Sequence, residues 1–452
     1  MTTRGANRGN AVAEANLRGV LSRLRSTARH VDTRAVRGRI TRAIGTLLHA
    51  VLPDARIGEL CVVQDPRTGW SLEAEVIGLR EDGVLLTPIG DLQGLSSRAE
   101  VVATGRMHEV PVGPDLLGRV IDSFGRPLDG KGAVKVTETR PLRGKAPNPM
   151  TRRIIERPLP LGVRVLDGLL TCGEGQRIGI YGDAGCGKST LMSQIVKGAD
   201  AEVTVVALIG ERGREVREFI ERHIGEAALR RTVVVVETSD RSAMERAQCA
   251  HTATALAEYF RDQGQRVVLM MDSLTRFSRA MREIGLAAGE PPTRRGFPPS
   301  VFAMLPGLLE RAGMDACGSI TAFYTVLVEG EGTGDPIAEE TRGILDGHIV
   351  LSRSIAARAQ FPAIDVLSSR SRVMDAVVSA QHREAASFFR DLLSRHAEAE
   401  FLVKVGEYKQ GSDPLTDRAI ASIDDLNNFL RQSENDASSF EETVTWMCRL
   451  TA

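Results

Sequence analysis

The chain has 452 residues, with 58 Lys and Arg against 58 Asp and Glu, so its formal net charge at pH 7 is zero. A balanced charge gives no general attraction to nucleic acid or to acidic membranes. Hydrophobic residues make up 42% of the chain, which is enough for large cores. At about 150 residues per domain, the length of the chain predicts roughly three domains. Aromatic residues make up only 4%, so these cores must be mainly aliphatic.

Six cysteines are scattered along the chain without C-x-x-C spacing, at positions 61, 172, 186, 249, 317 and 448. This spacing argues against a zinc site and a disulfide framework, and it favours a reducing compartment. No apolar run approaches the roughly 18–20 residues that span a bilayer, and no signal-peptide hydrophobic region is evident. We therefore expect a cytoplasmic chain, or one that is at most peripheral to a membrane.

The N-terminal segment, residues 1–36, is strongly basic. Residues 1–45 contain ten arginines and no lysine, against two acidic residues. Ala, Leu and Val recur on one face at helical spacing between positions 13 and 31, which predicts an amphipathic helix. Such a helix suits an acidic lipid surface or a helix of a partner protein. The Gly and Asn residues at 5–10 equally suit a solvated, partly disordered tail.

Short alternating strands separated by turn residues predict a small β-barrel over residues 37–107. The predicted strands cover residues 45–52, 59–63, 71–76, 83–87 and 100–104. No aromatic residues interleave these strands as a platform on which bases could stack. The pattern therefore disfavours a reader of single-stranded nucleic acid, and we predict no nucleic-acid partner.

The most informative motif is G-x-x-x-x-G-K-S, formed by Gly182-Asp183-Ala184-Gly185-Cys186-Gly187-Lys188-Ser189-Thr190. A short apolar strand over 176–181 precedes it, and apolar residues at helical spacing follow it. Glycines allow successive backbone N–H groups to point at phosphate oxygens, and the helix N-terminus adds a favourable dipole. Lys188 can reach the β- and γ-phosphates, and Ser189 can bind Mg²⁺. The motif in this setting predicts that the chain binds a nucleoside triphosphate.

Residues 108–373 alternate strand and helix, with continuous apolar runs at 204–209, 232–237, 266–271 and 319–328 and a predicted crossover helix at 242–261. Such runs are typical of parallel strands covered by helices on both faces, whose ligands bind beyond the strand C-termini. Asp272 ends one run, where it could orient Mg²⁺ through water, and Glu211 follows another, where it could polarise an attacking water. A carboxylate at a strand end is more often a helix cap. The sheet edge shared with the phosphate loop favours the catalytic interpretation here.

The last region, residues 374–452, has helical periodicity. Apolar residues recur at three- and four-residue spacing over 386–393 and again over 419–430. This spacing predicts a small helical domain.

Several longer motifs resemble the ATPase of bacterial type III secretion systems, a relative of the catalytic subunit of the F-type rotary ATPase, from about residue 37 to the end. The motifs are Gly210–Val216 (GERGREV), Leu269–Arg276 (LMMDSLTR), Gly285–Pro292 (GLAAGEPP), Gly296–Ser300 (GFPPS) and Pro362–Leu367 (PAIDVL). The resemblance implies an α/β fold: a RecA-like P-loop ATPase core with an N-terminal small β-barrel and a C-terminal helical domain.

The resemblance also implies a homohexamer that uses ATP and Mg²⁺ to detach chaperones and to unfold and export effectors. Its implied partners are stator and stalk proteins, the export gate and chaperone–effector complexes. It places the chain in the cytoplasm, peripheral at the inner membrane. Acidic inner-membrane lipid and a stator protein remain two alternative contacts for the N-terminal segment.

By position in the family motifs, Lys188 and Ser189 bind phosphate and metal. Glu211 corresponds to the catalytic carboxylate, and Arg212 steadies the region of the γ-phosphate. Asp272 corresponds to the Walker B acid.

Two further roles follow from the resemblance alone. Phe361 stands where relatives place an aromatic ring against adenine, and Arg372 resembles the arginine finger that reaches the nucleotide of the neighbouring subunit. Arg370 lies two residues away and leaves the finger assignment open; for either arginine the alternative is a surface ion pair worth at most about 1 kcal/mol. Cys186 replaces the usual Val or Ala, which should matter little because the backbone binds the phosphate.

The sequence disfavours three alternatives. Flagellar export ATPases tend to read G-Y-x-P-S and G-D-D-M-N-E-P where this chain has GFPPS at 296–300 and GEGTGDP at 330–336. These differences, and SSFEET at 438–443, favour the injectisome branch. A non-catalytic nucleotide-binding ring subunit would lack the carboxylate of Glu211. An RNA-translocating hexameric helicase would need base-stacking aromatics on the barrel.

Overall fold

The computed structural model describes residues 36–136, 138–183, 185–328 and 334–452. The predicted N-terminal helix and Ala184 therefore lie outside the described residues. The chain divides into two compact units, the first containing most residues up to Arg106 and the second running from Met107 to Ala452 together with residues 45–47 and 87–91. Among the described residues, no helix has the length and apolar character needed to cross a membrane.

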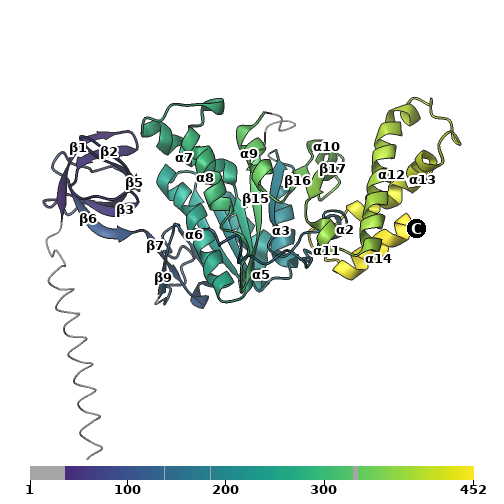
Figure 1. Ribbon diagram of the computed structural model, residues 1–452, viewed down its shortest axis with the longest axis horizontal. Coiled ribbons are helices and arrows are strands. Elements are labelled where there is room, and N and C mark those ends of the chain that lie inside the picture. The colour runs from purple at the N-terminus through teal and green to yellow at the C-terminus, as the bar shows by residue number, and fades with distance from the viewer. Residues whose placement is uncertain (1–35, 137, 184, 329–333) are drawn as a thin grey trace, which may run out of the picture. The chain divides into compact units, whose positions relative to one another are not determined.

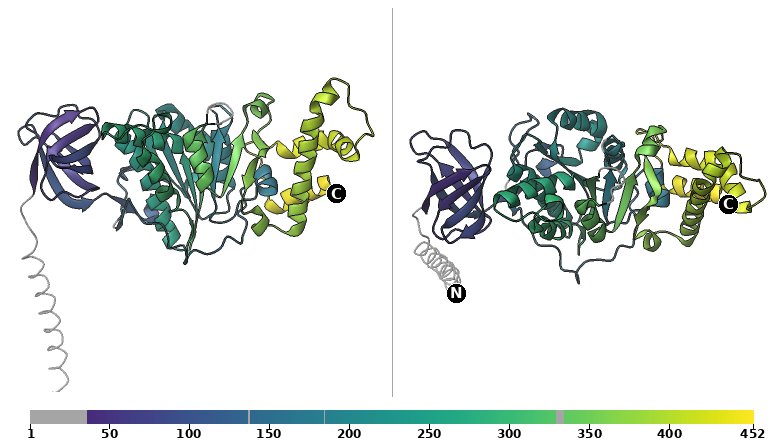
Figure 2. Two further views of the ribbon diagram at one scale, coloured as in Figure 1. Left: turned by 45° about the horizontal axis from the view of Figure 1, so that its top comes forward. Right: turned by 90° about the horizontal axis from the view of Figure 1, so that it is seen from above.

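Six strands form a closed barrel in the first unit, in the order β1-β2-β5-β4-β3-β6 (Figure 2). Their bounds are β1 Arg37–Ile44, β2 Leu47–Val51, β3 Glu59–Gln64, β4 Ser71–Arg80, β5 Gly83–Ile89 and β6 Glu100–Met107. Alternate residues of β3 are buried in an aliphatic core that includes Leu48, Val63 and Leu86. The predicted barrel is confirmed. The sequence analysis missed β1, because this strand is largely exposed and its sequence RGRITRAI has few apolar residues.

A mainly parallel sheet organises the second unit, with the strand order β17-β16-β10-β15-β13-β11-β12-β8. The bounds are β8 Val120–Ile121, β10 Arg177–Gly182, β11 Val203–Glu211, β12 Thr232–Thr238, β13 Arg266–Asp272, β14 Gly313–Met314, β15 Ser319–Leu327, β16 Gly347–Leu351 and β17 Ile364–Ser371, and β7 Glu109–Val112 pairs with β9 Glu138–Pro141. The central strands are buried along nearly their whole length, as their continuous apolar runs predict. Only β14 and β17 join this sheet antiparallel.

Helices cover this sheet, and Figure 1 shows α6 on one side of it and α3 on the other. Before residue 374, the helices of the described residues are α2 Arg164–Leu169, α3 Lys188–Gly198, α4 Gly213–Glu218, α5 Gly225–Leu229, α6 Ala243–Asp262, α7 Leu274–Ala287, α8 Pro299–Leu309, α9 Pro336–Ile344 and α10 Arg353–Ala357, with the short turns η1 Pro114–Leu116 and η3 Arg294–Gly296 and the π-helix η2 Phe219–Ile224. The predicted crossover helix is α6. It begins with a capping box between Ser242 and Glu245, which satisfies backbone N–H groups at its start.

Four helices end the chain: α11 Met374–Val377, α12 Ala380–Lys404, α13 Pro414–Leu430 and α14 Phe440–Thr451. The ring of Phe429 lies 5.2 Å from that of Phe389 and 5.4 Å from that of Trp446, which brings α12, α13 and α14 together. The predicted helical periodicity is confirmed for α12 and α13. The sequence analysis missed α14, although the capping box from Ser439 to Glu442 is a signal that could have indicated its start.

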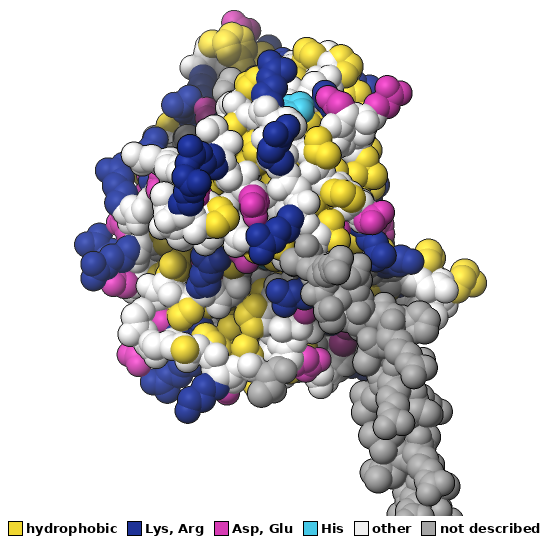
Figure 3. All heavy atoms as spheres, turned by 90° about the vertical axis from the view of Figure 1, so that its left-hand side faces the viewer, with side chains coloured by type: hydrophobic (Ala, Val, Ile, Leu, Met, Phe, Trp, Pro, Cys, Tyr) yellow, Lys and Arg dark blue, Asp and Glu magenta, His cyan; other side chains and the backbone are white. Residues whose placement is uncertain are grey.

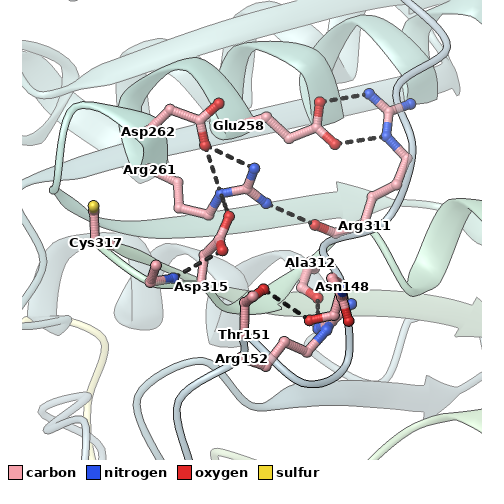
Figure 4. A network of polar contacts seen from close by, with 12 residues as sticks. Asn148, Thr151, Arg152, Glu258, Arg261, Asp262, Arg311, Ala312, Asp315 and Cys317 are labelled. Atoms are coloured by element: carbon pink, nitrogen blue, oxygen red, sulfur yellow. Dashed lines mark hydrogen bonds and ion pairs between the residues drawn. The ribbon is translucent and has the colours of Figure 1, made fainter.

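A buried ionic network lies near the C-terminal end of α6 (Figure 4). Arg311 donates two hydrogen bonds of 2.8 Å to Glu258, and each of these side chains is 2% exposed. Arg311 also donates to the carbonyl of Leu142 at 2.8 Å, and Arg261 donates to the carbonyl of Arg311 at 3.1 Å. At Gly144 an added Cβ would lie 3.0 Å from Glu258, so the backbone passes directly over the ion pair. The network ties the segment after β9 to the body of the sheet.

We expect Glu258→Ala to destabilise the second unit by about 3–5 kcal/mol, because it leaves the Arg311 guanidinium buried without its partner. Thermal denaturation of the purified chain should show a large fall in melting temperature. The matched control is Glu226→Ala, which removes an exposed ion pair with Arg230 and should leave the melting temperature nearly unchanged. Equal small shifts in both variants would contradict a central role for the buried pair.

Candidate nucleotide-binding site

A cavity of about 570 Å³ opens where β10, β11 and β13 end, at the C-terminal edge of the parallel strands. The residues that line it come from the phosphate loop, the ends of β11 and β13, α4, η2 and α7. They are Asp183, Gly185, Gly187, Lys188, Ser189, Thr190, Leu208, Glu211, Arg212, Glu215, Val216, Phe219, Asp272, Arg276 and Leu327. The fold therefore brings most of the predicted site residues to one cavity.

The phosphate loop has the backbone that its glycines predict. Gly185 and Gly187 have φ values of +83° and +81°, a left-handed conformation that favours glycine. At Gly182 an added Cβ would lie 2.9 Å from the Leu351 side chain, so glycine lets β10 lie close to β16. The Cys186 side chain is fully buried in the aliphatic core, which suits its predicted replacement of Val or Ala.

Lys188 and Asp272 form a shielded ion pair. Lys188 Nζ lies 2.9 Å from Asp272 Oδ1, and the two side chains are 13% and 7% exposed. Thr325 donates its hydroxyl to the same carboxylate oxygen at 2.5 Å. Lys188 begins α3, whereas Asp272 ends β13 and Thr325 lies in the adjacent strand β15. The order of the strands therefore decides this contact.

Glu211 lies at the end of β11 with its side chain 12% exposed, and Arg276 Nη2 donates to its Oε2 at 3.1 Å. Burial raises the pKa of Glu211, the nearby Asp272 carboxylate raises it further, and Arg276 and Lys188 oppose the shift. A carboxyl group in a cavity with a raised pKa is suited to accept a proton near neutral pH.

Arg212 follows Glu211 but has a different environment. Its side chain is 66% exposed and donates to Glu215 at 3.1 Å. Both residues line the cavity. Arg212 is therefore an exposed cation at the rim, and its predicted contact with the γ-phosphate stays a prediction.

Phe361 lies beside the phosphate loop, just before β17. A Cβ added to Gly187 would lie 3.3 Å from the Phe361 ring, and 41% of the residue is exposed. The backbone N–H of Gln432, after α13, donates to the Phe361 carbonyl at 2.8 Å. A partly exposed ring next to the loop is compatible with the predicted contact to adenine.

Arg370 lies near the end of β17 that is farther from the phosphate loop, and Arg372 follows this end directly. Because β17 runs antiparallel to β16, its residue Ile364 pairs with Leu351 near the phosphate loop, whereas Ser371 pairs with Gly347. The two ends of β17 are roughly 23 Å apart at 3.3 Å per residue. Both arginines are exposed, and Arg372 donates to the carbonyl of Arg342 at 3.0 Å. Neither arginine is therefore positioned to act on the cavity of its own chain.

The donor set of the cavity fits Mg²⁺. Among the described residues no cluster of three or more His, Cys, Asp or Glu side chains is arranged to hold a metal ion. Magnesium in phosphate-loop enzymes needs no such cluster, because phosphate and water oxygens complete its coordination. The Ser189 hydroxyl and the Asp272 carboxylate, both lining the cavity, supply hard oxygen atoms of the required kind.

Comparison with known proteins finds similarity over nearly the whole chain. Family models match the ATP synthase alpha/beta family β-barrel domain at residues 40–105, the nucleotide-binding domain of that family at 162–371 and the T3SS EscN ATPase C-terminal domain at 378–449. A type 3 secretion system ATPase from Sinorhizobium fredii is 78% identical over 443 residues, which cover 98% of each chain. The chain belongs to the type 3 secretion system ATPase family.

Other relatives show the breadth of the similarity. The type 3 secretion system ATPase of Xanthomonas euvesicatoria is 56% identical over 92% of this chain and 94% of its own length. The flagellum-specific ATP synthase of Bacillus subtilis is 49% identical over 92% of this chain and 95% of its own. The solved structure of the assembled ATPase EscN from enteropathogenic E. coli has a TM-score of 0.88 and 48% identity, and the match covers 92% of this chain and 100% of EscN.

As a member of this family, the chain is an ATP-binding ATPase of type 3 secretion. The predicted family, fold class and function are confirmed, including the preference for the secretion branch over the flagellar one. The assignments of individual site residues and the domain boundaries stay predictions.

Arg276 is one of the cavity residues that the sequence analysis missed in this ATPase, and it contacts the predicted catalytic carboxylate. It lies in the LMMDSLTR motif, four residues after Asp272 and in the first turn of α7. Besides its bond to Glu211, it donates to the carbonyl of Gly210. Arg276 could have been predicted from its position in the first turn of α7, a helix that follows directly after β13 and its last residue, Asp272.

Proposed function

We propose that this chain hydrolyses ATP in a homohexameric ring and acts as a translocase that releases chaperones, unfolds effectors and drives their export. The observation that carries the proposal is the grouping of Lys188, Glu211 and Asp272 at one cavity beside the phosphate loop. A non-catalytic ring subunit would not need the carboxylate of Glu211 there. The description of EscN as an assembled ATPase, with a second structure in complex with its central stalk EscO, supports a ring and a stalk partner.

The chain's own residues would act as follows. The ammonium of Lys188 exchanges the Asp272 carboxylate for phosphate oxygens of ATP, and the backbone N–H groups of the loop hold the remaining charge. Ser189 and Asp272 would hold Mg²⁺, which would supply positive charge to the phosphates. Glu211 orients a water molecule in line with the γ-phosphate and accepts its proton, while Arg212 approaches from the rim.

The site is completed by a second copy of the chain. Because Arg372 lies at the sheet edge far from its own cavity, its guanidinium can serve only the nucleotide of a neighbouring subunit. A positive charge delivered across the interface would stabilise the transition state of phosphoryl transfer. Hydrolysis then requires an assembled ring.

We also propose a cytoplasmic location, peripheral at the inner membrane, with the stator, stalk, export gate and chaperone–effector complexes as partners. The basic segment 1–36 would contact acidic lipid or a stator protein. On the barrel, Arg37, Arg39 and Arg98 line a groove of about 550 Å³ together with Glu100. Figure 3, which faces the barrel, shows basic side chains interspersed with acidic ones. This mixed surface suits a protein partner.

Glu211→Gln tests the catalytic assignment. The amide keeps the shape of the side chain but cannot accept a proton, so we expect ATP to bind with near wild-type affinity while hydrolysis falls by about 10²–10⁴. Calorimetric ATP binding and steady-state turnover of the purified chain measure the two effects separately. Glu202→Gln, which changes a partly exposed carboxylate paired with Arg266, serves as the control with unchanged turnover.

In cells that lack the ATPase, the Glu211→Gln chain should also fail to restore effector secretion. Loss of ATP binding in step with turnover would make Glu211 structural and contradict its catalytic role. Normal secretion by a hydrolysis-deficient chain would contradict the proposed coupling to export.

A further inference from the structure

The loop between α13 and α14, residues 431–439, is fixed to the core of the second unit by buried hydrogen bonds. The Gln432 side chain accepts from the backbone N–H of Arg164 and donates to the carbonyl of Gly162, both at 2.8 Å, and the residue is only 4% exposed. Arg164 is also buried and donates to Asp436 at 2.9 Å. With its polar groups satisfied in this way, the loop has a defined position against α2.

From this loop, Glu434 reaches two elements that form the nucleotide cavity. Its Oε1 lies 2.9 Å from His223 Nδ1 and 3.0 Å from Ser193 Oγ. Ser193 belongs to α3, about 7 Å along the helix from Lys188 at 1.5 Å per residue. His223 belongs to the π-helix η2, whose first residue, Phe219, lines the cavity. Glu434 therefore joins the phosphate-loop helix to a cavity wall.

The same loop makes two further contacts around the cavity. The Ser433 carbonyl accepts from Gln194 Nε2 of α3 at 3.0 Å. The Gln432 backbone N–H donates to the carbonyl of Phe361, the predicted adenine contact. One short loop thus contacts the phosphate-loop helix, the π-helix and Phe361.

The contacts of Glu434 with His223 and Ser193 join a rare type of helix to a charged side chain. A π-helix is a rare conformation that occurs mostly as single turns, often at functional sites. Because Phe219 of η2 lines the cavity, contacts that position η2 bear on the nucleotide site. Burial by itself would raise the pKa of Glu434, but hydrogen bonds from His223 and Ser193, with the charge of Lys197, keep that pKa below its ordinary value. The carboxylate is therefore charged at neutral pH, and its hydrogen bonds are charge-assisted.

We infer that Glu434 is a positioning residue for nucleotide binding, which holds the π-helical wall against the phosphate-loop helix and couples the α13–α14 loop to the cavity. The inference rests on the proposed hydrolysis of ATP at this site. Glu434 does not line the cavity, so it acts on nucleotide affinity and leaves the chemical step to the groups described above. A partner bound to the C-terminal helices could then change nucleotide affinity through this loop.

The test compares Glu434→Ala with Glu434→Gln in the purified full chain. We expect Glu434→Ala to raise the Kd for ADP and the KM for ATP about three- to tenfold, because charge-assisted bonds are lost. The kcat should change by less than about twofold, since uniform binding is removed. Glu434→Gln keeps an acceptor oxygen for His223 but not the charge, so its Kd should lie between those of the wild type and Glu434→Ala. Calorimetry with ADP measures binding apart from turnover.

Glu441→Ala is the matched control, because Glu441 is an exposed acidic residue in the first turn of α14, directly after the same loop, and takes no part in the contacts with α3 or η2 described above. It should bind ADP like the wild type. Combining Glu434→Ala with His223→Ala should weaken binding no more than the stronger single change, since both changes remove the same contact between Glu434 and His223.

Equal weakening by Glu441→Ala, multiplying effects in the double variant, or a fall in kcat without a change in affinity would each overturn the inference. Absence of ATP hydrolysis in the wild-type chain would instead refute the proposed function, because ADP binding is measured independently of it.

Discussion

Lys188→Ala is expected to abolish ATP hydrolysis and to weaken nucleotide binding severely. The change removes the one side-chain cation that begins α3 and can leave Asp272 for the phosphates. It also leaves the Asp272 carboxylate, 7% exposed, without its partner, so the ligand-free chain should lose stability as well. Turnover assays, calorimetry with ATP and thermal denaturation measure the three effects.

Lys404→Ala is a suitable control, because Lys404 is exposed and pairs with Glu400 on α12, away from the cavity. It should bind and hydrolyse ATP like the wild type. Hydrolysis by Lys188→Ala near the wild-type rate would refute the assignment of the phosphate loop as the catalytic one.

Arg372→Ala is expected to reduce hydrolysis by about 10³–10⁵, the range for arginine fingers, while ATP still binds. The reason is geometric: Arg372 lies at the far end of β17 from its own phosphate loop, so it can stabilise the transition state only in a neighbour. Specific activity of the wild type should rise steeply with protein concentration as rings form, and Arg372→Ala should lose this rise.

Mixing variants tests the shared site directly. Arg372→Ala chains mixed with Lys188→Ala chains should regain part of the activity, because some interfaces combine an intact phosphate loop with an intact finger. Lys188→Ala mixed with Glu211→Gln should regain none, since both defects lie at the cavity of the same chain. Activity independent of concentration in a monomeric sample would exclude a shared site. A defect in Arg370→Ala but not in Arg372→Ala would move the finger by two residues.

The local patterns of the sequence determined most of the elements. Continuous apolar runs indicated the buried parallel strands β11, β12, β13 and β15. A strand covered by helices on both faces buries every side chain, so apolar and polar residues do not alternate along it. The phosphate loop was equally clear, since its glycines, lysine and serine are contiguous. The family resemblance then added Phe361 and Arg372, which no spacing or periodicity indicated.

Other elements were not predicted because their local sequence patterns are weak. The strand β1 is mostly exposed, β16 has only five residues, and β17 is mixed in polarity, so none of them carries a strong apolar signal. The sequence of the π-helix η2 has no pattern that distinguishes it from an α-helix. These elements form because neighbouring segments supply their partners.

Only the tertiary structure decided which side chains meet. The sequence by itself placed Lys188, Glu211 and Asp272 at strand or helix ends. The strand order then set the contact of Lys188 with Asp272 and that of Glu211 with Arg276, across wide sequence separations. The antiparallel direction of β17 separated Arg372 from its own cavity, and docking of the α13–α14 loop brought Glu434 to the π-helix. Local residue patterns encode the type of an element, whereas these contacts depend on long-range packing between elements.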